Sequence, residues 1–209
     1  MLTGDSFTDT GARVPTERSA RHMNRFSHPL RHTALLLIII LNCVCSGQST
    51  KLAASGESWR IIVAPESEPG ERLTVSGVVT AEDGKTPRAG VSVYVYHTDI
   101  RGYYSGETTN NSHPRLNGTM RTDARGRYEF ETIKPGPYPS ARVPAHIHYV
   151  VNAPGYRQKI FEIVFEGDAF ISEEMRRDAK SQDSIFSIRP LAKDNAGMLR
   201  CVQDIRLRK

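Results

Sequence analysis

The chain has little cysteine, and this scarcity excludes a disulfide framework. Only three of its 209 residues are cysteines, namely Cys43, Cys45 and Cys201. The first two lie in an N-terminal segment that we expect to be removed, so the mature chain would keep Cys201 alone. Cys201 stands in an alternating segment and is interpreted as a small core residue. The stability of the mature domain is therefore expected to come from packing.

A long apolar run is also missing. The uninterrupted run at residues 34–41 is shorter than the roughly 20 apolar residues that a membrane span requires. Basic residues, among them Arg25 and Arg31, precede this run, and small residues follow it, which is typical of a signal peptide. Met23 would make a more conventional start than Met1. Lipidation of Cys43 or Cys45 is the weaker alternative.

These features predict three segments. Residues 1–47 are interpreted as a leader whose apolar region covers about 34–45, residues 48–58 as a small, polar linker, and residues 59–209 as one domain. We therefore expect a secreted or periplasmic protein. After removal of the leader, no stable membrane association is expected.

A long run of basic residues is also missing from the sequence of the predicted domain. The formal net charge is +5 with a pI of about 9.2, but the leader contributes more basic than acidic residues. The domain contains no basic run with interleaved aromatic residues. Nucleic acid is therefore not an expected partner.

Short alternating apolar runs, broken by Gly, Pro, Asp and Asn, fill the predicted domain. The expected strands are residues 73–80, 91–97, 119–122, 127–133, 145–152, 160–165, 184–189 and 199–207. Residues 171–180 alone favour a helix, with acidic residues early and basic residues late. The pattern predicts an all-β fold, an antiparallel β-sandwich with one short helix.

The strongest local signal for chemistry is the pair His146 and His148. Residues two apart in a strand project from the same face, so both imidazoles can reach one metal ion. A metal-free, hydrogen-bonded pair is the alternative. No carboxylate stands at a spacing that completes a two-histidine, one-carboxylate triad with them, and no second cysteine remains for a structural zinc site. A zinc hydrolase is therefore disfavoured.

Tyrosine is the remaining hard anionic ligand, and it suits Fe(III), because a trivalent cation can ionise a phenol at neutral pH. Tyr138 lies between two prolines in a loop just before the histidine pair. Tyr104 lies in a loop that follows the predicted strand ending at His97. A capping aromatic ring for Tyr138 and a surface turn for Tyr104 are the alternatives.

Five motifs in order carry a resemblance to a known family. They are GVV, PRAGVSVYVYHTDIRGYY, TMRTDARGRYEFETIKPGPYP, PAHIHYVV and FEIVFEGD, which together cover about residues 73–168. This core resembles that of the intradiol ring-cleavage dioxygenases, the family of protocatechuate 3,4-dioxygenase and catechol 1,2-dioxygenase. The resemblance implies a β-sandwich around one Fe(III) ion that is held by two tyrosines and two histidines.

The resemblance also implies a set of site residues. The metal ligands would be Tyr104, Tyr138, His146 and His148, with Tyr103 as the rival for the first position. Tyr138 would in addition act as a general base that takes a proton from the diol. The implied substrates are a small aromatic diol and O2, and the implied products are dicarboxylic acids of the muconate type.

Two departures from the family pattern concern catalysis. Well-studied members have an arginine three residues before the first histidine, where this chain has Val143, and its arginine is Arg142. In a strand, this shift of one residue would turn Arg142 to the opposite face, unless a loop restores its reach. The second departure is Glu162, where those members have glutamine. A carboxylate there would disfavour an anionic intermediate unless it were protonated or paired with Arg142.

The other polar candidates are expected to be structural. His97 is interpreted as a packing or supporting residue and His113 as loop surface. The carboxylates Asp99, Asp123, Glu166 and Asp168 are interpreted as turn and cap formers.

Two classes of function stay open from the sequence. The first is an Fe(III) intradiol dioxygenase that acts on catechol-type diols outside the cytoplasm. The alternative is a non-catalytic, secreted β-sandwich binding module that retains the family scaffold. The identity of the diol and the oligomeric state stay open, and a homo-oligomer would associate through sheet faces or edges.

Overall fold

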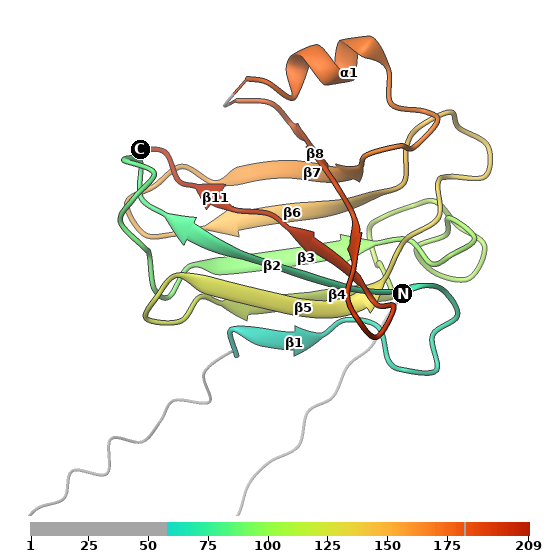
Figure 1. Cartoon of the computed structure of the whole chain (residues 1–209), viewed down its shortest axis with the longest axis horizontal. Coiled ribbons are helices and arrows are strands. Elements are labelled where there is room, and N and C mark those ends of the chain that lie inside the picture. The colour runs from blue at the N-terminus through green and yellow to red at the C-terminus, as the bar shows by residue number, and fades with distance from the viewer. Residues whose placement is uncertain (1–57, 182) are drawn as a thin grey trace, which may run out of the picture. The chain divides into compact units, whose positions relative to one another are not determined.

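Two β-sheets face one another in the computed structural model, which describes residues 58–181 and 183–209 (Figure 1). The described residues belong to one compact unit. The predicted leader, and the predicted linker up to residue 57, lie outside the described residues. Among the described residues, no helix has the length and apolar character needed to cross a membrane.

The first sheet has six strands. The order is β1 (Arg60–Ile62), β5 (Arg127–Ile133), β2 (Arg72–Thr80), β10 (Leu199–Val202) and β9 (Ala192–Lys193), and β11 (Ile205–Arg206) also pairs with β2. The β1–β5, β2–β10 and β2–β11 pairs are parallel. The sequence pattern did not predict these parallel pairs, because alternation reports which face of a strand is buried and not the direction of its neighbour.

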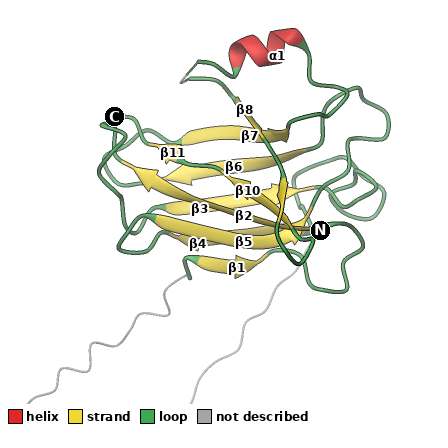
Figure 2. Cartoon of the chain, viewed as in Figure 1, coloured by secondary structure: helices red, strands yellow, loops and turns green. Residues whose placement is uncertain are grey.

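The second sheet has five strands and carries the candidate site. Its order is β4 (Leu116–Arg121), β3 (Ser92–His97), β6 (His146–Asn152), β7 (Lys159–Phe165) and β8 (Phe186–Arg189). All neighbours are antiparallel except β7 and β8. The prediction of a β-sandwich with one short helix is confirmed (Figure 2).

The core lies between the two sheets and is built from alternate residues of their strands. Ile147 and Tyr149 of β6 are fully buried, as is Phe130 of β5. The Tyr149 ring meets Phe130 edge-on at 6.2 Å, and it stacks on Phe161 of β7 at 4.8 Å. Because the inner face of β6 takes the odd-numbered residues, its even-numbered residues project from the outer face of the five-stranded sheet.

Some boundaries differ from the sequence prediction. The single strand expected at residues 199–207 is divided into β10 and β11, because the backbone between them turns toward β2. There the Gln203 N–H donates to the Ser76 carbonyl, and Asp204 Oδ1 accepts from the Val78 N–H. Gly77 permits this close approach, since a Cβ there would lie 1.9 Å from the Gln203 oxygen. The short edge strands β1 and β9 were not predicted.

The helix is also shorter than expected. It was predicted at residues 171–180, but α1 covers Glu173–Asp178. The Ser172 hydroxyl accepts a hydrogen bond from the Met175 N–H and so caps the first turn. α1 contacts β8, and Figure 1 shows it at the β7–β8 edge of the five-stranded sheet.

Candidate metal centre and active site

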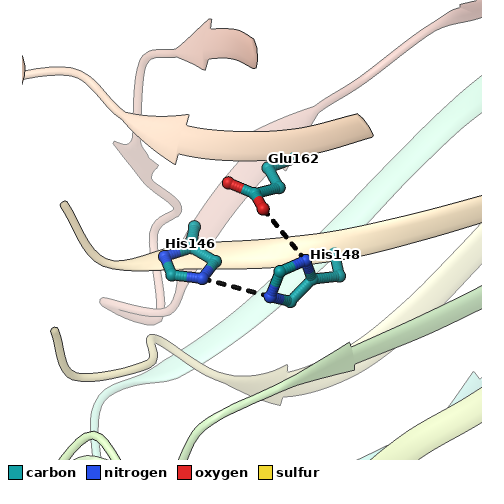
Figure 3. A group of neighbouring side chains, drawn as sticks. All are labelled: His146, His148 and Glu162. Atoms are coloured by element: carbon teal, nitrogen blue, oxygen red, sulfur yellow. Dashed lines mark hydrogen bonds and ion pairs between the residues drawn. The ribbon is translucent and has the colours of Figure 1, made fainter. Parts of the chain in front are cut away.

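The two histidines of β6 stand side by side on the outer face of the five-stranded sheet. His146 and His148 project to the same side of the strand (Figure 3). Ile147 between them is fully buried in the core. Their Nε2 atoms are 3.1 Å apart. The prediction that strand periodicity brings these two imidazoles together is confirmed by the geometry.

Two loops bring the tyrosines to the histidines. Tyr104 lies between β3 and β4, and Tyr138 lies between β5 and β6. The loops contact each other directly, because the Gly136 N–H donates to the Asp99 carbonyl at 2.9 Å. Glycine is required at Gly102, where φ is +87° and a Cβ would lie 2.0 Å from the Pro137 oxygen. The small residue two positions before Tyr104 therefore allows the loops to approach.

Tyr104, and not Tyr103, faces the histidines. The Tyr104 side chain is buried, with 1% of its surface exposed. The Tyr103 carbonyl accepts from the Asp99 N–H, and the Tyr103 N–H donates to Asp99 Oδ1. The Tyr103 ring lies 5.4 Å from the Arg101 guanidinium. The structure therefore removes Tyr103 as the rival candidate.

Four side-chain atoms meet at one point. The Tyr104 oxygen lies 2.6 Å from the Tyr138 oxygen and 2.6 Å from His148 Nε2. The Tyr138 oxygen lies 3.2 Å from His146 Nε2. These separations are near those of neighbouring ligands that each lie about 2 Å from a shared ion. All four residues that were predicted as metal ligands are thus brought together.

The hydrogen bonds behind the histidines direct their lone pairs to this point. His146 Nδ1 lies 2.8 Å from the Pro144 carbonyl oxygen, which can only accept, so Nδ1 carries the hydrogen. His148 Nδ1 lies 3.1 Å from Glu162 Oε1 and likewise donates. In the neutral rings both Nε2 atoms are therefore acceptors, and no hydrogen lies between them. Two lone pairs that face each other at 3.1 Å fit a cation and disfavour a metal-free hydrogen bond between the rings.

Burial favours the neutral forms of Tyr104, Tyr138 and His146. Burial raises the pKa of Tyr104, and the hydrogen bond with Tyr138 adds to the increase. Burial also raises the pKa of Tyr138, although its hydrogen bond with Tyr104 acts in the opposite direction. Burial lowers the pKa of His146. Two phenols with raised pKa values need a strong local cation in order to ionise, and this donor set fits Fe(III).

Glu162 corrects one statement from the sequence, namely that no carboxylate accompanies the histidine pair. Glu162 of β7 is paired directly with His148 of β6 in the strand register, a neighbourhood that spacing along the chain does not reveal. His146, His148 and Glu162 each offer a ligand atom within 4.8 Å of the others. Figure 3 shows the carboxylate pointing at the His148 nitrogen opposite to the one that faces His146. In this arrangement Glu162 orients His148, and its carboxylate is not one of the four converging ligand atoms.

Glu162 is ionised, and its partner is not the one considered from the sequence. Burial acts to raise the pKa of Glu162, but the hydrogen bond from His148 and the favourable electrostatic interaction with the two histidines bring the pKa below its ordinary value. Pairing with Arg142 was the expected way to neutralise it. The Arg142 guanidinium instead lies 6.0 Å from the Phe170 ring centre, and within residues 58–181 and 183–209 it has no ion pair.

Arg142 belongs to a loop, so the expected change of face does not apply. The strand β6 begins only at His146. Arg142 lines a cavity of about 330 Å³ beside the four-atom point. Other lining residues are Tyr138, His146, Glu162, Phe170 and Phe186. Tyr138 and His146 therefore face open space, whereas Tyr104 is enclosed.

The remaining polar residues are structural, but Glu166 forms an ion pair with Arg176 instead of the predicted turn or cap. His97 is fully buried, with Nε2 at 2.6 Å from Thr132 Oγ1, and burial lowers its pKa to about 4. His113 is exposed in a loop. Asp99, Asp123 and Asp168 accept backbone N–H groups in turns, and Glu166 pairs with Arg176.

Comparisons with known proteins agree with this geometry. A family model described as "Dioxygenase" matches residues 50–208. Catechol 1,2-dioxygenase 2 of Acinetobacter lwoffii is 33% identical over 124 residues, which cover 52% of this chain and 45% of that protein. The protocatechuate 3,4-dioxygenase beta chain of Burkholderia cepacia is 34% identical over 114 residues, which cover 49% and 48%. The chain thus spans about half the length of these curated relatives.

Solved structures show the same fold. The dioxygenase domain of a dioxygenase and carbohydrate-binding fusion protein from Streptomyces sp. SirexAA-E is 25% identical, with a TM-score of 0.55, and 70% of this chain matches 86% of it. Catechol 1,2-dioxygenase of Acinetobacter radioresistens is also 25% identical, with a TM-score of 0.58 and coverage of 75% and 59%. With the family match over residues 50–208 and the two-sheet fold, the chain belongs to the intradiol ring-cleavage dioxygenase family.

Proposed function

We propose that the protein is a non-haem Fe(III) dioxygenase that cleaves the aromatic ring of catechol-type diols between the two hydroxylated carbons. The observation that carries this proposal is the convergence of Tyr104, Tyr138, His146 and His148, whose four ligand atoms are separated by 2.6–3.2 Å along the measured contacts. The net reaction adds both atoms of O2 to the diol and yields a dicarboxylic acid of the muconate type.

Iron would be held by the two phenolate oxygens and the two Nε2 atoms. When bound, Fe(III) supplies Lewis acidity, which draws electron density from a chelated diol and makes its ring reactive toward O2. The neighbouring groups of this chain orient the ligands, provide a base and exclude water.

Tyr138 is the proposed base. Of the two tyrosines, it is the one that lines the cavity, and it is held by a loop with Pro137 and Pro139 on either side. Its oxygen can therefore reach a diol in the cavity and take the proton from a hydroxyl group. Tyr104 is enclosed and remains a ligand.

Glu162 and Arg142 carry opposite charges at the cavity. Glu162 fixes the ring orientation of His148 through Nδ1, and a carboxylate at this position increases the basicity of the imidazole. Arg142 also lines the cavity, and its guanidinium lies near the Phe170 ring. We propose that it stabilises negative charge on the substrate, because it is the one arginine or lysine among the described residues that line this cavity.

The substrate class is proposed at the level of aromatic diols. The relatives are named for catechol, chlorocatechol, 6-chlorohydroxyquinol and protocatechuate. A cavity of about 330 Å³ with Phe170 and Phe186 in its lining suits a single aromatic ring.

We also propose that the protein acts outside the cytoplasm, in a secreted or periplasmic location. The apolar run at residues 34–41, with basic residues before it and small residues after it, supports this proposal. N-terminal sequencing of the mature protein tests it. A mature chain that still begins at Met1 or Met23 would contradict it.

Oxygen uptake by iron-loaded protein is the experiment that tests the activity. We expect a coloured protein, because Fe(III)-bound phenolate absorbs visible light, and uptake of one O2 per diol with at least one member of a panel of catechol, protocatechuate and hydroxyquinol. A protein that binds iron but turns over none of these diols would instead favour the non-catalytic binding module.

A further inference from the structure

A second cavity lies away from the four ligand atoms, where β7, β8 and the C-terminal segment meet. It has a volume of about 170 Å³ and includes four cationic residues in its lining, namely Lys159, Arg189, Arg206 and Arg208. Asp204 is the one carboxylate among the described lining residues. We call this space the basic cavity.

Arg189 is held in this cavity by hydrogen bonds to uncharged side chains. Its Nε–H donates to Gln203 Oε1 at 2.7 Å and to Ser187 Oγ at 2.9 Å. Neither acceptor carries a charge, and within the part of the chain that the structure describes, no carboxylate pairs with Arg189. A guanidinium that is half-buried without a counter-charge is costly unless an anion completes its partners.

The clamp on Arg189 is rigid. Gln203 is buried, with 4% of its surface exposed, and every polar group of the residue is engaged. Its side-chain oxygen also accepts from the Ser187 hydroxyl at 2.8 Å, and its amide nitrogen donates to the Asp204 carbonyl at 2.6 Å. Because this clamp uses only the Nε–H of Arg189, the fork of its terminal amino groups is left for a ligand, and such a fork matches carboxylate and phosphate oxygens.

Lys159 adds a second cation whose charge is poorly balanced. Its Nζ lies 5.4 Å from the Phe161 ring centre, and no salt bridge joins it to a carboxylate of the described residues. Burial lowers the pKa of Lys159, and the charge of Arg208 lowers it further, although Asp183 acts in the opposite direction. Arg208 therefore repels Lys159, although Arg208 is itself paired with Asp183 at 3.1 Å, and an anion bound beside Lys159 would relieve this repulsion.

We propose that the basic cavity binds a small oxyanion, a carboxylate or a phosphate, between Lys159 and the guanidinium of Arg189. A neighbouring space of about 340 Å³ shares Lys159, Ser184 and Arg208 with it, so a ligand with a second anionic group has room to extend. Phe186 lines both the basic cavity and the cavity beside the candidate metal centre. This proposal does not depend on ring cleavage.

Calorimetric titration of the full chain, together with its thermal midpoint, tests the site. The probes are inorganic phosphate, sulfate and adipate, a six-carbon dicarboxylate, each compared with chloride at matched ionic strength. We expect saturable binding of phosphate or adipate, and the stronger of the two distinguishes an inorganic ligand from a carboxylate. An equal response to chloride would show screening alone and would overturn the proposal.

Three variants distinguish binding in the basic cavity from nonspecific attraction of anions to a positively charged surface. Arg189→Gln should weaken binding at least tenfold and Lys159→Gln several-fold. Lys193→Gln removes an exposed cation of β9 that pairs with Glu71, and this variant should bind the anion as the parent does. Arg189→Gln loses the hydrogen bonds to Gln203 and Ser187 and could fail to fold for that reason. In that case the anion affinity of Lys159→Gln tests the proposal. Unchanged affinity in a folded Lys159→Gln protein would overturn the assignment.

Discussion

His148 donates from Nδ1 to the Glu162 carboxylate across the β6–β7 pair, with 3.1 Å between nitrogen and oxygen. The contact leaves Nε2 of His148 directed at Tyr104 and His146. A ligand that is oriented by a carboxylate behind it loses less freedom on binding a metal than a free side chain does. Three predictions concern the candidate site, and one concerns acid stability.

Glu162→Ala should weaken iron binding about 10- to 100-fold, because His148 loses the group that orients it. Glu162→Gln keeps an acceptor for the Nδ1–H without the charge, and it should lie between Glu162→Ala and the parent protein. Competition with a chelator measures the affinity, and the phenolate charge-transfer band reports the ligand field. Glu166→Gln is the control, because it changes a nearby carboxylate that directly follows β7 and does not contact His148. Equal affinity in all four proteins would contradict the role of Glu162.

Tyr138→Phe should retain iron through Tyr104 and the two histidines but lose about 10²- to 10⁴-fold in turnover, since the proposed base is removed. Its visible band should shift and weaken, because one of two phenolates is gone. Oxygen uptake and the visible spectrum are measured on the same sample. Tyr103→Phe is the matched control, since its ring lies near Arg101, and it should behave as the parent. Unchanged turnover in Tyr138→Phe would remove Tyr138 from the mechanism.

Gly102→Ala should disrupt the candidate site, because its Cβ would lie 2.0 Å from the Pro137 oxygen and would push the two tyrosine loops apart. Gly106→Ala, in the same loop, provides the control. Gly106 also has a positive φ, +57°, but nothing lies within 4 Å of its added Cβ. It should therefore cost only about 1 kcal/mol of backbone strain. Iron content and thermal midpoint are compared, and retention of iron by Gly102→Ala would refute the role of this contact.

Glu68 should stabilise the fold at neutral pH through Arg115, whose guanidinium donates to it. This hydrogen bond lowers the pKa of Glu68, while burial opposes the shift. A carboxylate with a lowered folded-state pKa contributes stability above its unfolded value of about 4.5, and this contribution is lost as the pH falls through the folded value. Since Arg115 is about half exposed, we expect a contribution of about 1 kcal/mol.

Urea unfolding at pH 7 and at pH 3 measures this contribution. Glu68→Gln should be less stable than the parent at pH 7, and the difference should be smaller at pH 3, because the contribution of the carboxylate falls as the pH drops below the unfolded-state value of about 4.5. Glu66→Gln changes an exposed carboxylate two residues away and is the control. A difference between Glu68→Gln and the parent that is equal at both pH values would rule out the ionic origin.

Much of the fold was predictable, because a strand with one buried face has a local pattern of alternating apolar and polar residues. Alternation identified β5 at its observed bounds, Arg127–Ile133, and placed both histidines of β6 on one face. The short edge strands β1 and β9 leave too few residues for a period to be recognised, and their partners lie far away in the chain. The break between β10 and β11 depends on hydrogen bonds with β2, which is distant in the chain, so the local sequence pattern does not predict the break.

The sequence alone determined the histidine pair, the two loop tyrosines and the family, because these depend on residue type, spacing and motif order along the chain. Only the tertiary structure decided which neighbours those residues have. It excluded Tyr103, placed Glu162 behind His148 and located Arg142 in a loop beside the cavity. The physical reason is that strand register and loop contact join residues that are distant in the chain, and side-chain chemistry is set by such neighbours.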